Sequence, residues 1–189
     1  KTTLGGTEES DNTTRTVTIT VNGTNDVPVI SKGTGQSEAE TVVETDATRS
    51  TSGTLTVTDE DYSDTVTMLV DSVAIDAANT TAAVKGLLDG TAATLLSNAE
   101  LKSMLTVSNT STALGANPTG GSSFTWTFDS SNVSGNTNNV FDFIAKGEKL
   151  VLTYTLKATD NSGTKTTLGG TEESDNTTRT VTITVNGTN

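Results

Sequence analysis

A segment of 25 residues occurs twice in this chain without a single difference. Residues 1–25 and residues 165–189 both read KTTLGGTEESDNTTRTVTITVNGTN, so the second copy begins 164 positions after the first. An identical repeat of this length indicates a tandem array whose units arose by duplication. We therefore expect residues 1–25 to be the C-terminal strand and linker of a preceding repeat, and residues 26–189 to be one complete repeat module.

Within the duplicated segment, polar and apolar residues alternate as a strand with one buried face requires. The apolar face carries Val17, Ile19 and Val21 in the first copy and Val181, Ile183 and Val185 in the second. Further strands are predicted at residues 27–31, 41–44, 54–58, 65–73, 123–128 and 149–159. The only Trp, Trp126, shares a face with Phe124 and Phe128, so its strand should anchor the core. The pattern predicts an all-β sandwich.

Residues 77–106 depart from this pattern because they are rich in Ala and Leu. Within them, Ser97-Asn98-Ala99-Glu100 has the S-x-x-E form of a capping box, so a helix should begin there. Another short helix is predicted at Asn139–Ala145, with Gly147 ending it. We interpret these segments as short helical insertions that cover one side of the sandwich. A ligand-binding insert is the alternative.

The composition excludes several classes of protein. The chain has no Cys and no His, which rules out a disulfide framework, a zinc finger, a thiol nucleophile and a Ser-His-Asp triad. A formal net charge of −12 disfavours nucleic acid as a partner. No apolar run reaches the roughly 18 residues of a membrane-spanning helix, so no membrane insertion is expected. The composition is typical of an acidic, extracellular, all-β protein.

Three runs of sequence resemble the VCBS repeat, namely GGSSFTWTFDSSN, NNVFDFIAKGEKLVLTYTLKATDNSG and TRTVTITVNGTNDVPV. That repeat is a cadherin-like, immunoglobulin-like module found in tandem in large RTX adhesins of Gram-negative bacteria. The resemblance covers nearly all of residues 26–189, and its most specific part is the junction at residues 17–29. It implies an immunoglobulin-like or cadherin-like β-sandwich and calcium binding where modules join. It also implies export by a type I system to the bacterial cell surface, with roles in cell adhesion and biofilm formation.

Asp59-Glu60-Asp61-Tyr62-Ser63-Asp64 is an acidic loop that follows a predicted strand. Alternate Asp residues can aim carboxylates at a common point, as a hard cation that takes six to eight oxygen ligands requires. The loop is not an EF-hand, because the required Gly and the Glu at the twelfth position are missing. We predict that Asp59, Asp61 and Asp64 bind calcium, which the resemblance favours further. A solvated acidic turn is the alternative.

Other segments should meet this loop at the same pole. In an immunoglobulin-like sandwich, the linker before the first strand and the loop before the last strand both reach the pole where the acidic loop lies. The resemblance to cadherin junctions implies ligands from the linker, and nearby acidic residues could complete the site or add only diffuse negative charge. The further candidate ligands are Asn22, Asn25, Asp26, Asp160, Glu40 and Glu44, together with Glu172, Glu173 and Asp175.

These features together predict a calcium-stabilised extender (stalk) module of a giant bacterial surface adhesin, with neighbouring repeats of the same chain as its partners. The alternative is an adhesive module that itself recognises a surface glycan or protein. An enzyme is not expected, because the few aromatic residues are needed for the core and none is left to line a cleft. One sandwich has room for one final strand, so the tethered second copy should occupy it. Residues 13–21 should then fray or pair with another molecule.

Overall fold

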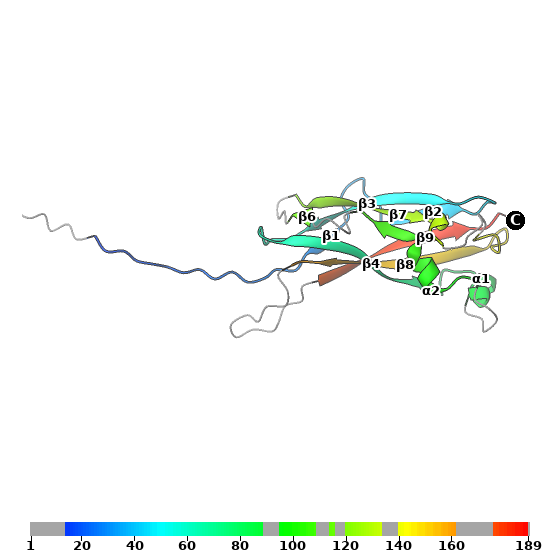
Figure 1. Ribbon diagram of the computed structural model, residues 1–189. Helices are drawn as coiled ribbons and strands as arrows, with labels where there is room; N and C mark the ends of the chain where they lie inside the picture. Colours follow the sequence, from blue (N-terminus) through cyan, green and yellow to red (C-terminus); the bar gives the residue numbers. More distant parts are fainter. Residues whose placement is uncertain are drawn as a thin grey trace, which may run out of the picture.

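The computed structural model describes residues 14–88, 95–108, 114–115, 120–133, 140–161 and 176–188. These residues form two β-sheets packed face to face around a shared core, which confirms the predicted all-β class (Figure 1). One sheet has the strand order β1-β3-β7-β5 and the other the order β2-β9-β8-β4-β6. The strands are β1 (Val29–Ser31), β2 (Ala39–Val43), β3 (Ser50–Thr58), β4 (Thr65–Ile75), β5 (Leu105–Val107), β6 (Leu114–Gly115), β7 (Ser122–Asp129), β8 (Lys149–Thr159) and β9 (Asn176–Asn186).

The pairing of β8 with β9 shows how the alternating sequence builds the sandwich. The two strands are antiparallel and in register from Lys149 opposite Asn186 to Thr159 opposite Asn176. On the other side of β9, β2 pairs in parallel, with Ala39 opposite Thr182. The final strand is therefore an interior strand of its sheet. The fully buried side chains that β8 and β9 contribute to the core include Leu150, Leu152, Tyr154, Leu156, Val181, Ile183 and Val185.

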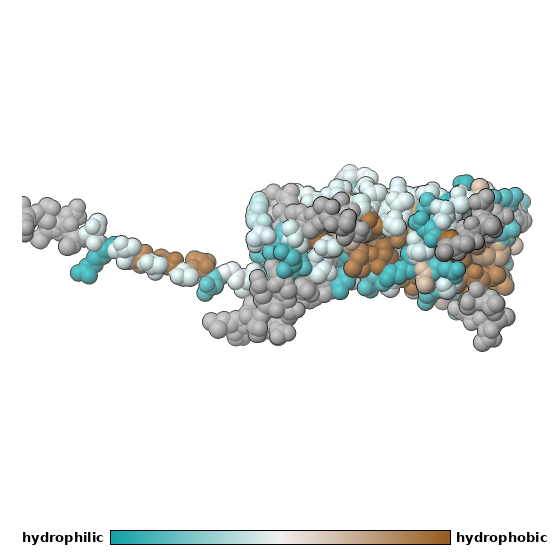
Figure 2. Space-filling model, in the orientation of Figure 1, coloured by the Kyte–Doolittle hydropathy of each residue, from teal (hydrophilic) through white to brown (hydrophobic). Residues whose placement is uncertain are grey.

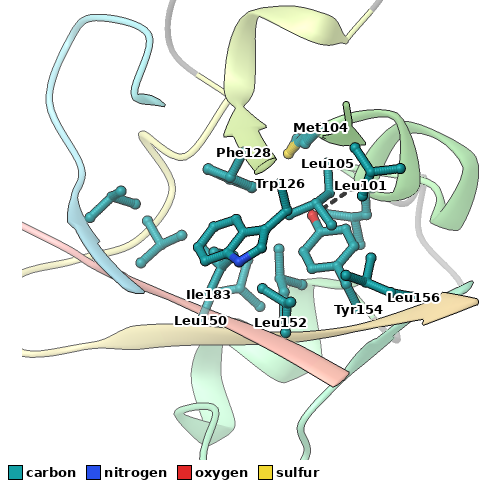
Figure 3. Close-up of a cluster of buried hydrophobic side chains, with 14 of the residues drawn as sticks. Leu101, Met104, Leu105, Trp126, Phe128, Leu150, Leu152, Tyr154, Leu156 and Ile183 are labelled. Atoms are coloured by element: carbon teal, nitrogen blue, oxygen red, sulfur yellow. Dashed lines mark hydrogen bonds between the residues drawn. The ribbon is translucent and has the colours of Figure 1, made fainter. Parts of the chain in front are cut away.

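Trp126 of β7 lies in the core, as the sequence predicts (Figure 3). Its ring is fully buried, and its Nε1 donates a hydrogen bond to the carbonyl oxygen of Ser37 at 2.8 Å. Gly53 on β3 makes room for this ring, because a Cβ there would lie 2.4 Å from Trp126 Cζ2. Tyr154 enters the core from the other sheet and donates its hydroxyl proton to the carbonyl oxygen of Leu101 at 2.8 Å. Both polar aromatic side chains are thus satisfied inside the core.

Two short helices, α1 (Ala82–Leu88) and α2 (Asn98–Ser103), lie in the predicted insertion. α2 begins at the predicted capping box, where Ser97 Oγ accepts from the Glu100 N–H and the Glu100 carboxylate accepts from the Ser97 N–H. Leu101 of α2 and Met104 after it are buried in the core. Among the described residues, no helix has the length and apolar character needed to cross a bilayer.

The predicted helical insertion at residues 77–106 is wrong at its C-terminal end. Leu105–Val107 forms the strand β5 and pairs with β7. Leu105 and Val107 are buried and Thr106 between them is exposed, which is the two-residue period of a strand rather than the period of a helix.

The helix predicted at residues 139–145 is also absent from its described part, residues 140–145, which forms turns. The Ile144 N–H bonds to the Phe141 carbonyl oxygen, and the Glu148 N–H bonds to that of Ala145. Phe141 and Ile144 are buried in the core, and Gly147 has φ of 86°, which ends the second turn. Burial of two large side chains by a tight chain reversal therefore outweighs local helix propensity here.

The two copies of the duplicated segment have different surroundings. The second copy forms β9, whereas residues 14–24 of the first copy form an extended arm that leads away from the sandwich (Figure 1). Apolar side chains lie exposed along this arm (Figure 2), and they are 81% exposed at Val17, 80% at Ile19 and 87% at Val21. Their counterparts in β9 are fully buried. The tethered second copy occupies the slot of the final strand, as expected.

Candidate metal centres

The strands bring six of the predicted ligands together at the pole where the chain enters the sandwich. β1 begins where β3 ends, because Val29 lies opposite Thr58, and β4 begins where β8 ends, because Thr67 lies opposite Thr159. The loop between β3 and β4, the linker before β1 and the residue after β8 therefore share this pole. We call the six residues the entry cluster: Asn25, Asp26, Asp59, Asp61, Asp64 and Asp160.

The three carboxylates of the acidic loop converge as predicted. One oxygen from each of Asp59, Asp61 and Asp64 lies within 4.8 Å of the other two. The loop backbone holds this shape, since the Asp61 N–H donates to Asp59 Oδ1 at 3.0 Å and the Asp64 N–H to the Asp61 carbonyl oxygen at 2.9 Å. Two oxygens that each lie about 2.4 Å from one calcium ion are at most about 4.8 Å apart. The three oxygens are therefore close enough to share one ion.

The linker before β1 is fastened to this loop and to the end of β8. The Asp26 N–H donates to Asp61 Oδ2 at 2.7 Å, and Asn25 Nδ2 donates to Asp160 Oδ2 at 3.2 Å. Asn25 and Asp160 are each 6% exposed. Asn25, the last residue of the first copy, is therefore bound to the sandwich that follows it in the chain.

Asp59 is the most deeply buried carboxylate of the entry cluster. It is 2% exposed, and neither its Oδ2 nor Asn25 Oδ1 has a hydrogen-bond partner within the described part of the chain. Burial raises the pKa of Asp59, the charges of Asp160, Asp64 and Asp61 raise it further, and the hydrogen bond from the Asp61 N–H opposes them. Buried acceptors without donors and adjacent like charges both cost free energy. A cation among these oxygens would offset both costs.

The donor set of the entry cluster suits a hard cation. Every candidate ligand atom is a carboxylate, amide or backbone oxygen, and the chain has no Cys or His to favour a softer metal. Calcium accepts six to eight oxygens in variable geometry, whereas magnesium demands a near-ideal octahedron and keeps several waters. A donor set that combines carboxylates from a loop with a side-chain amide from the linker therefore fits calcium better than magnesium.

Three other predicted ligands lie away from the entry cluster. Asn22 is exposed on the arm, and Glu40 is half-buried within β2 and belongs to neither group of converging carboxylates. Glu44 follows β2 at the opposite pole, because β2 runs parallel to β9 and ends beside Asn186. The further candidates Glu172, Glu173 and Asp175 lie outside the described residues.

Glu44 belongs to a second acidic group at the pole where the chain leaves the sandwich. Carboxylate oxygens of Glu44, Asp46 and Asp142 lie within 4.8 Å of one another, and we call these residues the exit cluster. Glu44 is 1% exposed, and its Oε1 has no hydrogen-bond partner among the described residues. Its Oε2 accepts from Thr188 Oγ1 at 2.9 Å and from the Thr188 N–H at 3.3 Å. The exit cluster therefore also presents a buried free oxygen beside two other carboxylates.

Sequence reasoning named neither Asp46 nor Asp142 as a ligand. Asp46 follows Glu44 by two residues, the same spacing that drew attention to Asp59 and Asp61, so a local signal existed. No local signal in the sequence pointed to Asp142, because this residue reaches the exit cluster only through the turns that replace the predicted helix.

Gly187 fixes the direction in which the chain leaves the exit pole. Its N–H donates to the Glu148 carbonyl oxygen at 3.0 Å, and a Cβ at this position would lie 2.1 Å from the carbonyl oxygen of Ile144. Only Gly at position 187 lets the segment after β9 lie this close to the neighbouring turn. Because Thr188 is also bound to Glu44, residues 187 and 188 lie against the surface of the sandwich.

Comparison with known proteins assigns no family. The sequence matches no protein-family model and no curated protein.

Proposed function

We propose that this chain is a calcium-stabilised extender module, and that a tandem array of such modules forms the stalk of a giant bacterial surface adhesin. The observation that carries the proposal is the buried Asp59 carboxylate, one oxygen of which has no hydrogen-bond partner among the described residues, and which lies among other acidic side chains where the linker joins the fold. The resemblance to the VCBS repeat supports the adhesin context, the extracellular location, and the role in adhesion and biofilm formation. The identical duplicated segment supports the array.

The repeat period, combined with the contacts of the linker, defines how two modules would join. Residues 186–189 have the same sequence as residues 22–25. Gly187 and Thr188 are bound to the exit pole of their own module, and Asn25 is bound to the entry pole of the module that follows it. With a period of 164 residues, position 189 of one module is position 25 of the next. No linker residue would be left free to act as a hinge.

Such a junction would bring the exit cluster of one module next to the entry cluster of the following module. Both clusters hold converging carboxylates, which repel one another over distances of a few ångströms. Calcium bound at the two clusters would cancel this repulsion and hold the junction in one geometry. The stalk would then be stiff in calcium and loose without it, which suits a module that keeps a distal domain away from the cell.

The solution shape of a chain with two consecutive modules tests the proposal. In millimolar calcium, small-angle scattering should show an extended particle with a narrow distribution of lengths. Removal of calcium should reduce the mean length of the particle and widen the distribution of lengths. Asp59→Asn in the second module should produce the loose form even in calcium. Asp71→Asn is the matched control, because Asp71 is exposed on β4 and belongs to neither cluster. Identical distance distributions with and without calcium would refute the proposal.

A further inference from the structure

In its sheet β9 lies between β2 and β8, and we call this position the β9 slot. The arm of a second molecule, residues 14–24, has the side chains that fit this slot. Residues 14–24 repeat residues 178–188 one for one, so every side chain with which these residues of β9 fill the slot is also present on the arm. Three of those side chains are fully buried in the slot, whereas their counterparts on the arm are at least 80% exposed. The arm is therefore a second strand of the right sequence that remains in water.

We propose that the β9 slot is a binding site for residues 14–24 of a second copy of this chain. The slot offers two strands to pair with, since β8 runs antiparallel along all of β9 and β2 pairs with its C-terminal half in parallel. Main-chain pairing would supply affinity, and the alternating apolar side chains would fix the register.

The polar contacts at the two ends of the slot are matched as well. Arg179 Nε donates to Glu38 Oε2 at 2.8 Å, and Arg15 is its counterpart on the arm. Thr188 binds Glu44 at the exit pole, and Thr24 is its counterpart. An arm in the slot therefore reproduces the ion pair and the hydrogen bonds as well as the apolar contacts.

The tether on the arm determines the geometry of the assembly. An arm whose Thr24 is bound to Glu44 of the acceptor molecule still has Asn25 and Asp26 bound to its own entry pole. The entry pole of the donor then meets the exit pole of the acceptor, as it would between consecutive modules of an array. This contact joins two different surfaces, so it propagates head to tail instead of closing as a two-fold dimer.

The chain's own β9 competes with the arm for the slot. Each molecule has one slot and two matching strands, so an exchange between intact chains exposes one strand for each that it buries. β9 is tethered, at an effective concentration on the order of millimolar. Occupancy of the slot by the chain's own β9 should therefore exceed occupancy by the arm of another molecule at micromolar concentration by about a thousandfold. Assembly should thus become dominant only when β9 itself is defective, in which case a neighbouring copy replaces it.

Two matched substitutions separate the two strands that can fill the slot. Ile183→Asp places a charge at a fully buried position of β9, whereas Ile19→Asp makes the same change on the exposed arm. At about 50 μM in metal-depleted buffer, the Ile183→Asp chain should stay folded and sediment as oligomers, because the slot takes the arm of another copy. The Ile19→Asp chain should be a folded monomer. The chain with both substitutions should neither fold nor assemble.

Disulfide trapping distinguishes insertion in register from non-specific association. Thr153 lies opposite Thr182, so Thr18 of an inserted arm would lie opposite Thr153 of the acceptor. In the Ile183→Asp chain, which has no native Cys, Thr18→Cys with Thr153→Cys should cross-link neighbouring molecules at least tenfold faster than Thr16→Cys with Thr153→Cys. Equal cross-linking of the two pairs would overturn the proposal. An Ile183→Asp chain that is unfolded, or is a folded monomer, at every concentration would also overturn it. Because no calcium is present, calcium binding cannot produce these outcomes.

Discussion

At the scale of single residues, Asp59 shows how a strand end can place a charge where the surrounding protein does not neutralise it. One carboxylate oxygen accepts the Asp61 N–H, and the other has no partner among the described residues. The position is nearly inaccessible to water, and three more carboxylates lie close enough to raise the pKa of Asp59. The same side chain therefore costs stability without a cation, and in the proposed calcium site it would contribute stability.

This dual role predicts opposite effects of acid with and without calcium. In metal-depleted buffer the pKa of Asp59 is higher in the folded state than its ordinary value of 3.8, so protonation favours folding. The destabilisation is present at neutral pH and is relieved as the pH falls through the raised pKa. In calcium, protons compete with the ion for the carboxylates, so the same acidification should lower the melting temperature.

Melting curves of the wild-type and Asp59→Asn chains at about pH 7 and about pH 5 measure this difference, because the variant cannot titrate at that position. Without metal, the variant should melt higher than the wild type at neutral pH, and the gap should narrow in acid. If the two chains melt at the same temperature at neutral pH, or if the difference between their melting temperatures grows in acid, burial does not destabilise the charged form of Asp59 as described.

At the scale of elements, the close approach of the linker to the exit pole depends on the absence of a side chain at Gly187. A Cβ there would meet backbone atoms of Ile144 and Ala145, whereas a Cβ at Gly86 in α1 would meet nothing within 4 Å. Gly187→Ala should therefore destabilise the fold by about 1–3 kcal/mol, as overpacking does. Gly86→Ala should stabilise it by about 0.5–1 kcal/mol, because Ala is the better helix former.

Denaturant unfolding of the two Gly variants and the wild type gives both free energies of unfolding. The pair is matched in chemistry and differs only in surroundings. If Gly187→Ala is neutral, the linker is not held against residues 144–145, and the case for a hinge-free junction fails.

Long strands with a clear alternation could be predicted from the sequence, whereas the short strands β5 and β6 could not. β8 was expected at residues 149–159 and lies at Lys149–Thr159, because eleven residues give the period-2 pattern several chances to show itself. β5 has three residues and β6 has two, which are too few to establish a period. Residues 140–145 were taken for part of a helix, because the form of the turns found there is decided by burial in the core rather than by local propensity.

The candidate site was predictable to the extent that its residues are close in sequence. Asp59, Asp61 and Asp64 share one loop, and their spacing alone indicates convergence. Asn25 and Asp160 were found through the expected topology, which places strand ends at a common pole. Asp142 joins Glu44 only because a distant turn packs beside the end of β2, and no local pattern encodes that approach.

At the scale of the whole molecule, the described residues place one acidic cluster at each pole of the sandwich, and in the proposed array the duplicated segment would link the two poles of successive modules. Residues 14–24 are exposed throughout and form no strand in the structure. A chain that begins at Asn25 should therefore unfold at the same denaturant concentration as the 189-residue chain. If loss of residues 1–24 unfolds the protein, the first copy belongs to the fold and the module boundary is wrong.

A chain that begins at Val27 should behave differently, because it also loses Asn25 and Asp26. These residues make one hydrogen bond each to the entry cluster, worth about 1 kcal/mol apiece. Metal-free stability should therefore fall by about 2 kcal/mol, and calcium affinity by at least about tenfold. Calorimetric titration of the chains that begin at Asn25 and at Val27 compares the affinities. Equal affinities would show that the linker supplies no ligand.

The central claim, that calcium binds at the entry cluster and stabilises the module, is tested most directly by the calcium dependence of the melting temperature in three chains. Calcium at 100 times its dissociation constant adds about 2.7 kcal/mol to the stability of a one-site protein, which corresponds to about 5–11 °C for a domain of this size. The wild-type and Asp71→Asn chains should show at least this rise, and Asp59→Asn should lose the part of it that the entry cluster contributes. A wild-type melting temperature that does not respond to calcium, or an equal rise in Asp59→Asn, would contradict the claim.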